Sequence, residues 1–155
     1  MGIHNNFPVS PFEIIDPKYR WKPDSVGKES ELSGLLPPFV EKIRKEVNEW
    51  RQFGYDGVSD TTRSLLNFWF SREHASFKYY FAQRESVESL IYIFENQKIN
   101  NNRKLLKYDS WGTVTESLLN DKWLRLVLKQ ATGTGKTKVL SLLIAWSYFH
   151  KLYEN

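Results

Sequence analysis

A short glycine-rich segment near the C-terminus constrains the fold of this chain more than any other feature. It reads Ala131-Thr132-Gly133-Thr134-Gly135-Lys136-Thr137 and stands between an apolar run and a helical pattern. The order strand, glycine-rich loop, helix gathers backbone N–H groups and a helix N-terminus around a polyphosphate. Lys136 is then expected to reach the outer phosphates, and the Thr137 hydroxyl to complete the shell of a Mg²⁺ ion. The alternative is a glycine turn that only joins a strand to a helix.

The flanking sequence predicts an α/β fold. Residues 124–129 (LRLVLK) read as a strand, and the helix predicted from Thr137 to about Tyr153 is apolar around most of its circumference. We therefore expect an α-rich N-terminal region followed by the first strand, P-loop and helix of an incomplete α/β lobe. Because a parallel sheet needs neighbouring strands, this pattern also predicts association of chains through Leu142–Phe149.

Three regions divide the chain. Residues 1–37 contain five prolines and read as an irregular N-terminal arm. Residues 38–106 read as mainly helical, with one helix from Pro38 to Gly54, a second capped by Ser59 or Asp60, and a third over 82–95. Residues 107–155 contain the predicted strand, glycine-rich loop and helix, with a short helix expected near Thr115–Leu119.

Composition excludes several classes of protein. Cysteine is absent, so the chain has neither disulfides nor thiolate zinc sites. The N-terminus lacks the pattern of a secretory signal, and no apolar run is long enough to span a bilayer. We therefore expect a cytoplasmic protein without membrane association. A net charge of +4 is compatible with nucleic acid but does not identify it.

The glycine-rich loop departs from the strict phosphate-loop pattern at one position. Gln130 stands where that pattern has its first glycine. The segment from Gln130 to Thr137 resembles motif I of superfamily-two helicases and translocases, especially the restriction-type branch. That resemblance implies that residues 107–155 are the start of a RecA-like ATPase lobe, truncated after the P-loop helix. It implies ATP and Mg²⁺ as cofactors and nucleotide contacts from Thr132, Gly133, Thr134, Gly135, Lys136 and Thr137. It also implies DNA as a partner of the complete parent protein, and the rest of a helicase or restriction complex as a further partner.

A second resemblance lies upstream. The segment Tyr80-Phe81-Ala82-Gln83-Arg84-Glu85-Ser86-Val87-Glu88 resembles the segment that supplies a glutamine to read adenine in these helicases. A glutamine amide offers donors and an acceptor, which suit N7 and N6 of adenine. Gln83 is therefore the predicted adenine contact, with Tyr80 and Phe81 able to stack on the base. The alternative places Gln83 at a helix start as an ordinary polar residue, with both aromatic rings in the core.

Looser similarities extend the resemblance over nearly the whole chain. Ser10–Pro17, Leu36–Pro38 and Thr62–Phe70 resemble the region ahead of motif I in DEAD/DEAH-type proteins related to the type III restriction helicase (Res) subunit. We therefore expect the ATP-binding N-terminal part of an ATP-dependent DNA helicase or translocase.

Catalysis by this chain alone is not expected. Such helicases need an Asp-Glu pair on a downstream strand and an arginine from a second lobe, and the sequence contains neither. We expect a chain truncated after the P-loop helix. The alternative is a non-catalytic nucleotide-binding or protein-interaction module left from a truncated helicase. A complete small phosphotransferase would need a lid and an acceptor site after the loop, for which little sequence remains.

Overall fold

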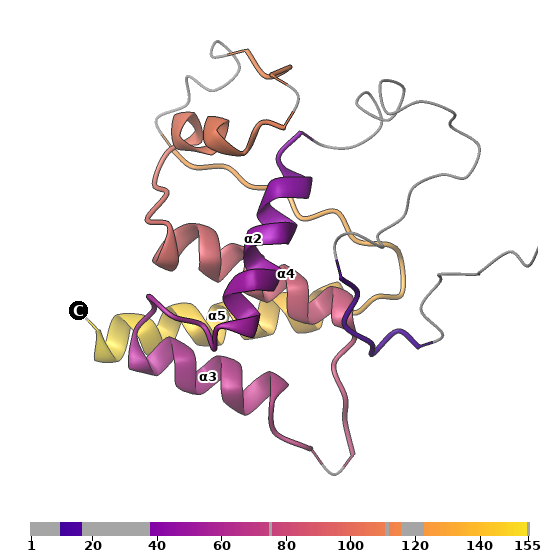
Figure 1. Ribbon diagram of the computed structural model, residues 1–155. Helices are drawn as coiled ribbons and strands as arrows, with labels where there is room; N and C mark the ends of the chain where they lie inside the picture. Colours follow the sequence, from indigo (N-terminus) through magenta and orange to yellow (C-terminus); the bar gives the residue numbers. More distant parts are fainter. Residues whose placement is uncertain (1–9, 17–37, 75, 111, 116–122, 155) are drawn as a thin grey trace, which may run out of the picture.

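The computed structural model describes residues 10–16, 38–74, 76–110, 112–115 and 123–154 (Figure 1). Its elements are helical and follow one another along the chain: α2 (Val40–Gln52), α3 (Asp60–Phe70), α4 (Phe81–Ile91), the π-helix η2 (Tyr92–Asn96), the 3₁₀-helix η3 (Asn102–Tyr108) and α5 (Lys136–Tyr153).

The expected α/β fold is wrong for this part of the chain. The described residues are 57% helical and contain no strand. The predicted strand at 124–129 runs without regular structure beside α5, and it alternates as a strand would, with Leu124 and Leu126 partly buried and Val127 81% exposed. A strand also needs a neighbouring backbone to pair with. Among the described residues the one β-bridge joins His74 to Phe77, far from this segment in sequence.

The first two predicted helices are confirmed. Trp50 and Val47 of α2 are buried, as the helical spacing of its apolar residues requires. Ser59 is the N-cap of α3, where its side chain accepts a hydrogen bond from the N–H of Thr62. Gly54 follows α2 with a φ of +73°, a conformation that favours glycine and ends the helix.

The third predicted helix is present, but its C-terminal turn is a π-helix and not an α-helix. It begins as α4 and passes into the π-helix η2, so the expected span of 82–95 covers two elements. η3 was not predicted; it starts where the Asn101 side chain accepts a hydrogen bond from the N–H of Lys104. The helix expected near Thr115–Leu119 falls almost wholly outside the described residues.

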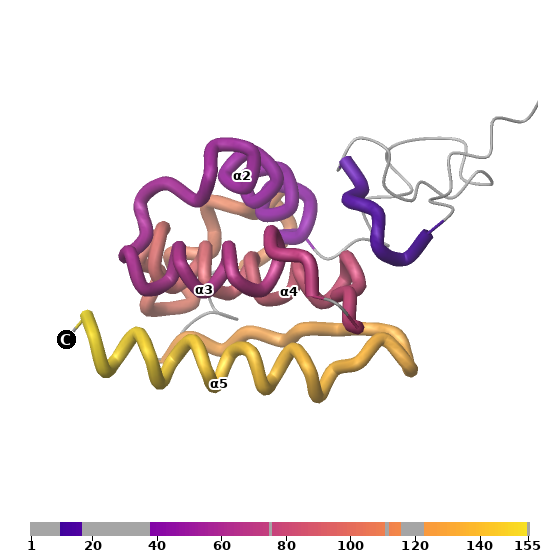
Figure 2. The backbone as a smooth tube through the Cα atoms, turned by 90° about the horizontal axis from the view of Figure 1, so that it is seen from below, coloured from indigo at the N-terminus to yellow at the C-terminus, as the bar shows by residue number. Residues whose placement is uncertain are grey.

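α5 and the segment leading into it lie together on one side of α2, α3 and α4 (Figure 2). The inner side of α5 buries Val139 and Leu142, whereas Leu140, Ile144 and Tyr148 on its outer side are about 60% exposed. Part of the expected association surface, Leu142–Phe149, therefore belongs to the core. Association of chains stays a prediction.

The C-terminal half of α5 is tied to the rest of the molecule by a carboxylate of η2. Glu95 accepts hydrogen bonds from the Ser59 N–H and the Thr62 hydroxyl, both at 2.6 Å. The indole N–H of Trp146 donates to the same hydroxyl at 2.9 Å, and His150 lies 3.6 Å from the carboxylate. This network joins α3, η2 and α5 at one point.

A second buried carboxylate joins α2 to α4. Glu88 has no exposed side-chain surface, and Arg51 of α2 donates to it from Nε at 2.9 Å and from Nη2. Arg84 donates from one helical turn earlier at 2.7 Å, and the hydroxyl of Tyr55 donates at 2.6 Å. Three donors thus compensate one buried negative charge, which holds the two helices in a defined relative position.

No helix within the described ranges has the length and apolar character needed to cross a membrane.

Substituting the buried carboxylate tests its role in the fold. Glu88→Gln removes the negative charge and leaves the two guanidinium groups without compensation, so we expect a loss of about 3 kcal/mol in the free energy of unfolding. Urea denaturation measures this loss. Glu73→Gln, at an exposed site, is the matched control and should change the free energy by less than about 0.5 kcal/mol. Equal effects of the two substitutions would contradict the assigned role.

The same cluster predicts a dependence of stability on alkaline pH. Burial raises the pKa of Tyr55 above its ordinary value of 10.0, and the charge of Glu88 raises it further. The folded state therefore retains a proton that the unfolded chain loses, so this contribution is complete below pH 10 and declines as the pH rises above it. The decline is at most about 1.4 kcal/mol per pH unit for one tyrosine.

Tyr55→Phe separates the two effects of the hydroxyl. At pH 8 it should lower the free energy of unfolding by about 1 kcal/mol because the bond to Glu88 is lost. Between pH 10 and 11 it should also reduce the steepness of the decline. Burial raises the pKa of Tyr92 and Tyr108 as well, so part of the slope should remain. An unchanged slope in the variant would contradict the prediction.

Candidate functional site

The glycine-rich loop adopts a backbone that only glycine accepts readily at two positions. Gly133 and Gly135 have φ values of +82° and +76°, and Gly135 is the residue from which α5 begins. The N–H groups of Gly133, Gly135, Lys136 and Thr137 find no acceptor within the described residues. Unpaired N–H groups at a helix N-terminus are the donors that bind phosphate oxygens.

Lys136 lies across its own loop. Its Nζ donates to the carbonyl oxygens of Gln130 and Ala131 at 3.2 and 3.0 Å, and the side chain is exposed. The cation is thereby held at the start of the loop by two neutral acceptors. Phosphate oxygens carry negative charge and form stronger bonds to an ammonium group, so a bound polyphosphate would displace these carbonyls.

Thr137 is exposed on the first turn of α5, where its hydroxyl is accessible to a metal ion held by the phosphates. Within the ranges that the structure covers, no cluster of three histidine, aspartate or glutamate side chains could hold a metal ion by itself. The exposed Thr137 hydroxyl is an oxygen ligand of the kind that Mg²⁺ accepts beside phosphate and water oxygens.

The structure brings Gln83 to the loop, although the two are far apart in sequence. Its Nε2 donates to the carbonyl of Thr134 at 3.0 Å, and its Oε1 accepts from the N–H of Tyr80 at 3.0 Å. The second bond closes the N-terminus of α4, as the glutamine of a capping box does. Each end of the amide keeps one further hydrogen-bonding capacity, the pair that an adenine edge requires. The side chain is only 4% exposed, however, so its visible role is to join α4 to the loop.

The two aromatic residues before Gln83 have separate surroundings. Phe81 is 5% exposed and packs in the core beneath the guanidinium of Arg51, 5.4 Å from the ring centroid, so it cannot stack on a base. The ring of Tyr80 is partly exposed and lies 5.2 Å from that of Phe12 in the N-terminal arm. The arm also supplies the Pro11 carbonyl, which accepts from the N–H of Phe81 at 2.8 Å.

Sequence reasoning missed two side chains at this site. Gln130 was considered only as the position at which the loop departs from the strict phosphate-loop pattern, yet its side-chain amide contacts α4. Its partner there is Ser86, a residue to which no sequence pattern pointed. No spacing rule could have paired them, because they are brought together only by the packing of α4 against the loop.

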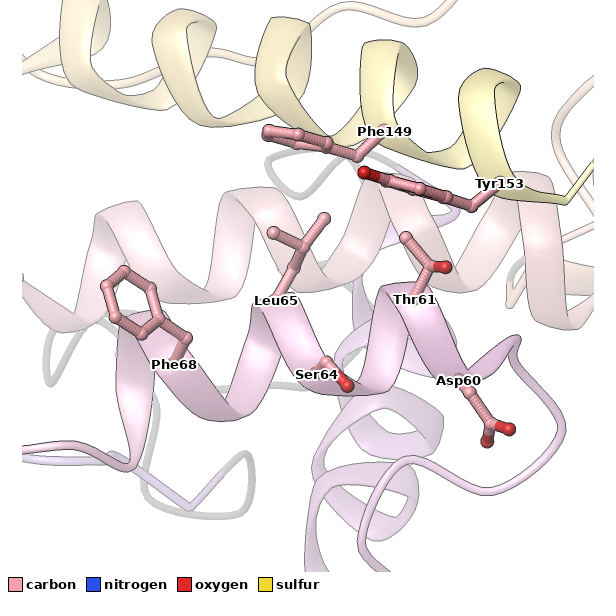
Figure 3. Close-up of a pocket in the computed structure, with 7 residues that line it drawn as sticks. All are labelled: Asp60, Thr61, Ser64, Leu65, Phe68, Phe149 and Tyr153. Atoms are coloured by element: carbon pink, nitrogen blue, oxygen red, sulfur yellow. The ribbon is translucent and has the colours of Figure 1, made fainter.

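A separate concave surface lies between α3 and α5, away from the loop (Figure 3). It encloses about 470 Å³ and is lined mainly by apolar groups of Leu65, Phe68, Phe149 and Tyr153. The lining contains an acidic residue, Asp60, and no basic one, so this surface is unsuited to a polyphosphate. The loop at 131–137 is the better candidate site for an anionic ligand.

Comparisons with protein-family models, curated proteins and solved structures found no match to this chain.

The contact between Gln83 and the loop predicts different costs for the two loop glycines. A Cβ added at Gly135 would lie 2.2 Å from Nε2 of Gln83, whereas a Cβ at Gly133 would meet no atom within 4 Å. Both alanine variants suffer the strain of a positive φ, about 1 kcal/mol or more. Gly135→Ala should lose about 1–2 kcal/mol beyond this, because the amide must move and give up its two bonds.

Urea denaturation of both variants, alone and combined with Gln83→Ala, measures this difference. Removing the amide removes the clash, so the gap between Gly135→Ala and Gly133→Ala should close in the Gln83→Ala background. A gap that persists there would show that Gln83 does not restrict the residue at 135.

Proposed function

We propose that the loop 131–137 binds the phosphates of ATP with Mg²⁺, in the ATP-binding part of an ATP-dependent DNA helicase or translocase of the restriction-enzyme type. The observation that carries the proposal is the set of N–H groups at Gly133, Gly135, Lys136 and Thr137, which lack acceptors within the described residues and lie at or just before the start of α5. The resemblance of the sequence to motif I supplies the choice of nucleotide and of parent function.

Each loop residue has one task in this proposal. The two glycines let the backbone approach the phosphates, and the N-terminus of α5 adds its positive end to their attraction for the anion. Lys136 exchanges its carbonyl partners for phosphate oxygens, and Thr137 offers its hydroxyl to the Mg²⁺ ion. Thr132 and Thr134 contribute backbone that encloses the phosphates. DNA and the remainder of a helicase or restriction complex are partners of the parent protein in this proposal.

The proposal concerns binding and not hydrolysis. Phosphoryl transfer depends on metal-binding carboxylates and on a cation that stabilises the transferring group. The chain has no Asp-Glu pair to supply those carboxylates. Gln83 retains the capacity to read adenine only if its side chain becomes more exposed when the nucleotide binds.

Titration with a fluorescent ATP analogue in the presence of Mg²⁺ tests the proposal. Lys136→Ala should raise the Kd roughly tenfold to a hundredfold, because a charge-assisted hydrogen bond contributes about 1.5–3 kcal/mol. Lys151→Ala, which removes an exposed lysine near the other end of α5, is the matched control and should leave the Kd within about twofold. Equal Kd values for wild type and Lys136→Ala would contradict the proposal.

Two further measurements separate the parts of the site. Thr137→Ala should weaken binding mainly when Mg²⁺ is present, because its hydroxyl is the protein ligand of that ion. Competition of GTP against ATP measures whether the base is read at all. Equal competition by the two nucleotides would contradict the adenine role of Gln83 and would leave the proposal of phosphate binding unaffected.

A further inference from the structure

A pair of glutamine side chains joins the glycine-rich loop to the first two turns of α4. From the loop, Nε2 of Gln130 donates to the hydroxyl of Ser86 and to the carbonyl of Ala82, the latter at 3.3 Å. From α4, Nε2 of Gln83 donates to the carbonyl of Thr134 at 3.0 Å. The bonds from Gln130 and the bond from Gln83 run in opposite directions, and they hold the start and the middle of the loop against α4.

The Ser86 hydroxyl completes this arrangement. It donates to the Ala82 carbonyl at 2.7 Å and therefore presents a lone pair to the amide of Gln130. In this assignment Nε2 of Gln130 donates, the Ser86 hydroxyl both accepts and donates, and the Ala82 carbonyl accepts, whereas the buried Oε1 of Gln130 has no partner within the described residues. The Ser86 hydroxyl therefore accepts a hydrogen bond from the loop in addition to donating one to the backbone of its own helix.

The anchored residue is also the one that holds Lys136. The backbone carbonyl of Gln130 accepts from Nζ of Lys136, and the next carbonyl, that of Ala131, accepts from the same atom. Fixing the Gln130 side chain on α4 therefore fixes the position of these two carbonyls. These two carbonyls in turn hold Nζ of Lys136 in its observed position.

The receiving helix is itself held firmly at the same turns. Glu88, two residues after Ser86, is buried against Arg51 of α2, and the N–H of Phe81 is bonded to the Pro11 carbonyl. Its first turns are therefore fixed to both α2 and the N-terminal arm. The loop consequently takes its shape from a helix that is distant in sequence.

From these contacts we propose that Gln130 and Ser86 are positioning residues that hold the loop in its phosphate-binding shape. The inference rests on the proposed function for its consequence in binding, but its physical content, an ordered loop, exists without nucleotide. Loss of either partner lets the loop fluctuate, so nucleotide must then order it and binds more weakly.

Amide hydrogen exchange of the Thr134 N–H in ligand-free protein, read by NMR, is the decisive measurement, because this loop N–H donates to the Ala131 carbonyl at 3.4 Å. Gln130→Ala and Ser86→Ala should each accelerate exchange about threefold to tenfold, and the double variant should exchange no faster than the single ones. Ser86→Thr keeps the hydroxyl and should restore the wild-type rate. Ser89→Ala on the same helix and Gln52→Ala on α2 are matched controls and should leave the exchange unchanged.

Nucleotide titration measures the consequence with the same variants. The Kd for the fluorescent ATP analogue should rise about threefold to tenfold for Gln130→Ala and for Ser86→Ala, and recover in Ser86→Thr. Adenosine, which lacks phosphates, should show a smaller change in the same competition assay.

The outcomes separate the two proposals. Unchanged exchange in Gln130→Ala would overturn the positioning role, whatever the nucleotide affinity. Accelerated exchange together with no nucleotide binding by the wild type would support the positioning of the loop and overturn the proposed function. Accelerated exchange with an unchanged Kd would overturn the link between loop order and binding. Thermal unfolding of each variant identifies any global loss of structure. Recovery of the wild-type exchange rate in Ser86→Thr shows that the effect of Ser86→Ala comes from loss of the hydroxyl.

Discussion

The carboxylate of Glu88 is fully buried, and a buried charge persists in a folded protein only when its surroundings supply opposite charge and hydrogen bonds. Arg51, Arg84 and Tyr55 supply both. Because these groups come from α2, α4 and the turn after α2, their convergence allows only one arrangement of the two helices. Apolar packing alone tolerates small shifts between helices, whereas this cluster does not. The position of α4 follows from it.

The candidate site depends on that position. α4 receives the N-terminal arm at Phe81, the loop carbonyl at Gln83 and the loop amide at Ser86, all within two helical turns. The loop has few contacts of its own because its glycines carry no side chains. Its shape is therefore supplied largely from outside, and the N–H groups of Gly133, Gly135, Lys136 and Thr137 lack acceptors within the described residues. The packing of the loop against α4 thus has two consequences: the loop is held by the side chains of Gln83 and Gln130, and part of its backbone N–H groups have no acceptor in the part of the chain that the structure describes.

Gln83 illustrates how far sequence reasoning could go. The resemblance of residues 80–88 to an adenine-reading segment predicted it as a residue of the site, and in the structure its amide contacts the loop. Its predicted partner was a base, whereas its partners in the structure are the carbonyl of Thr134 and the N–H of Tyr80. A glutamine amide is equally suited to all of these groups. Which one it meets depends on geometry that no local pattern contains, and the same holds for Gln130.

The sequence by itself determined the helices and the special backbone of the loop, because both depend on neighbours within a few residues. The apolar spacing of α2, the Ser59 cap of α3 and the glycines at 133 and 135 are cases of this kind. Only the tertiary structure decided whether residues 124–129 form a strand and which groups Gln83, Gln130 and Glu88 bind. A strand takes its hydrogen bonds from another segment, and a polar side chain takes its partner from whatever element packs against it. In the described residues no strand lies beside 124–129, so a sequence typical of a strand runs along α5 without a ladder of backbone hydrogen bonds.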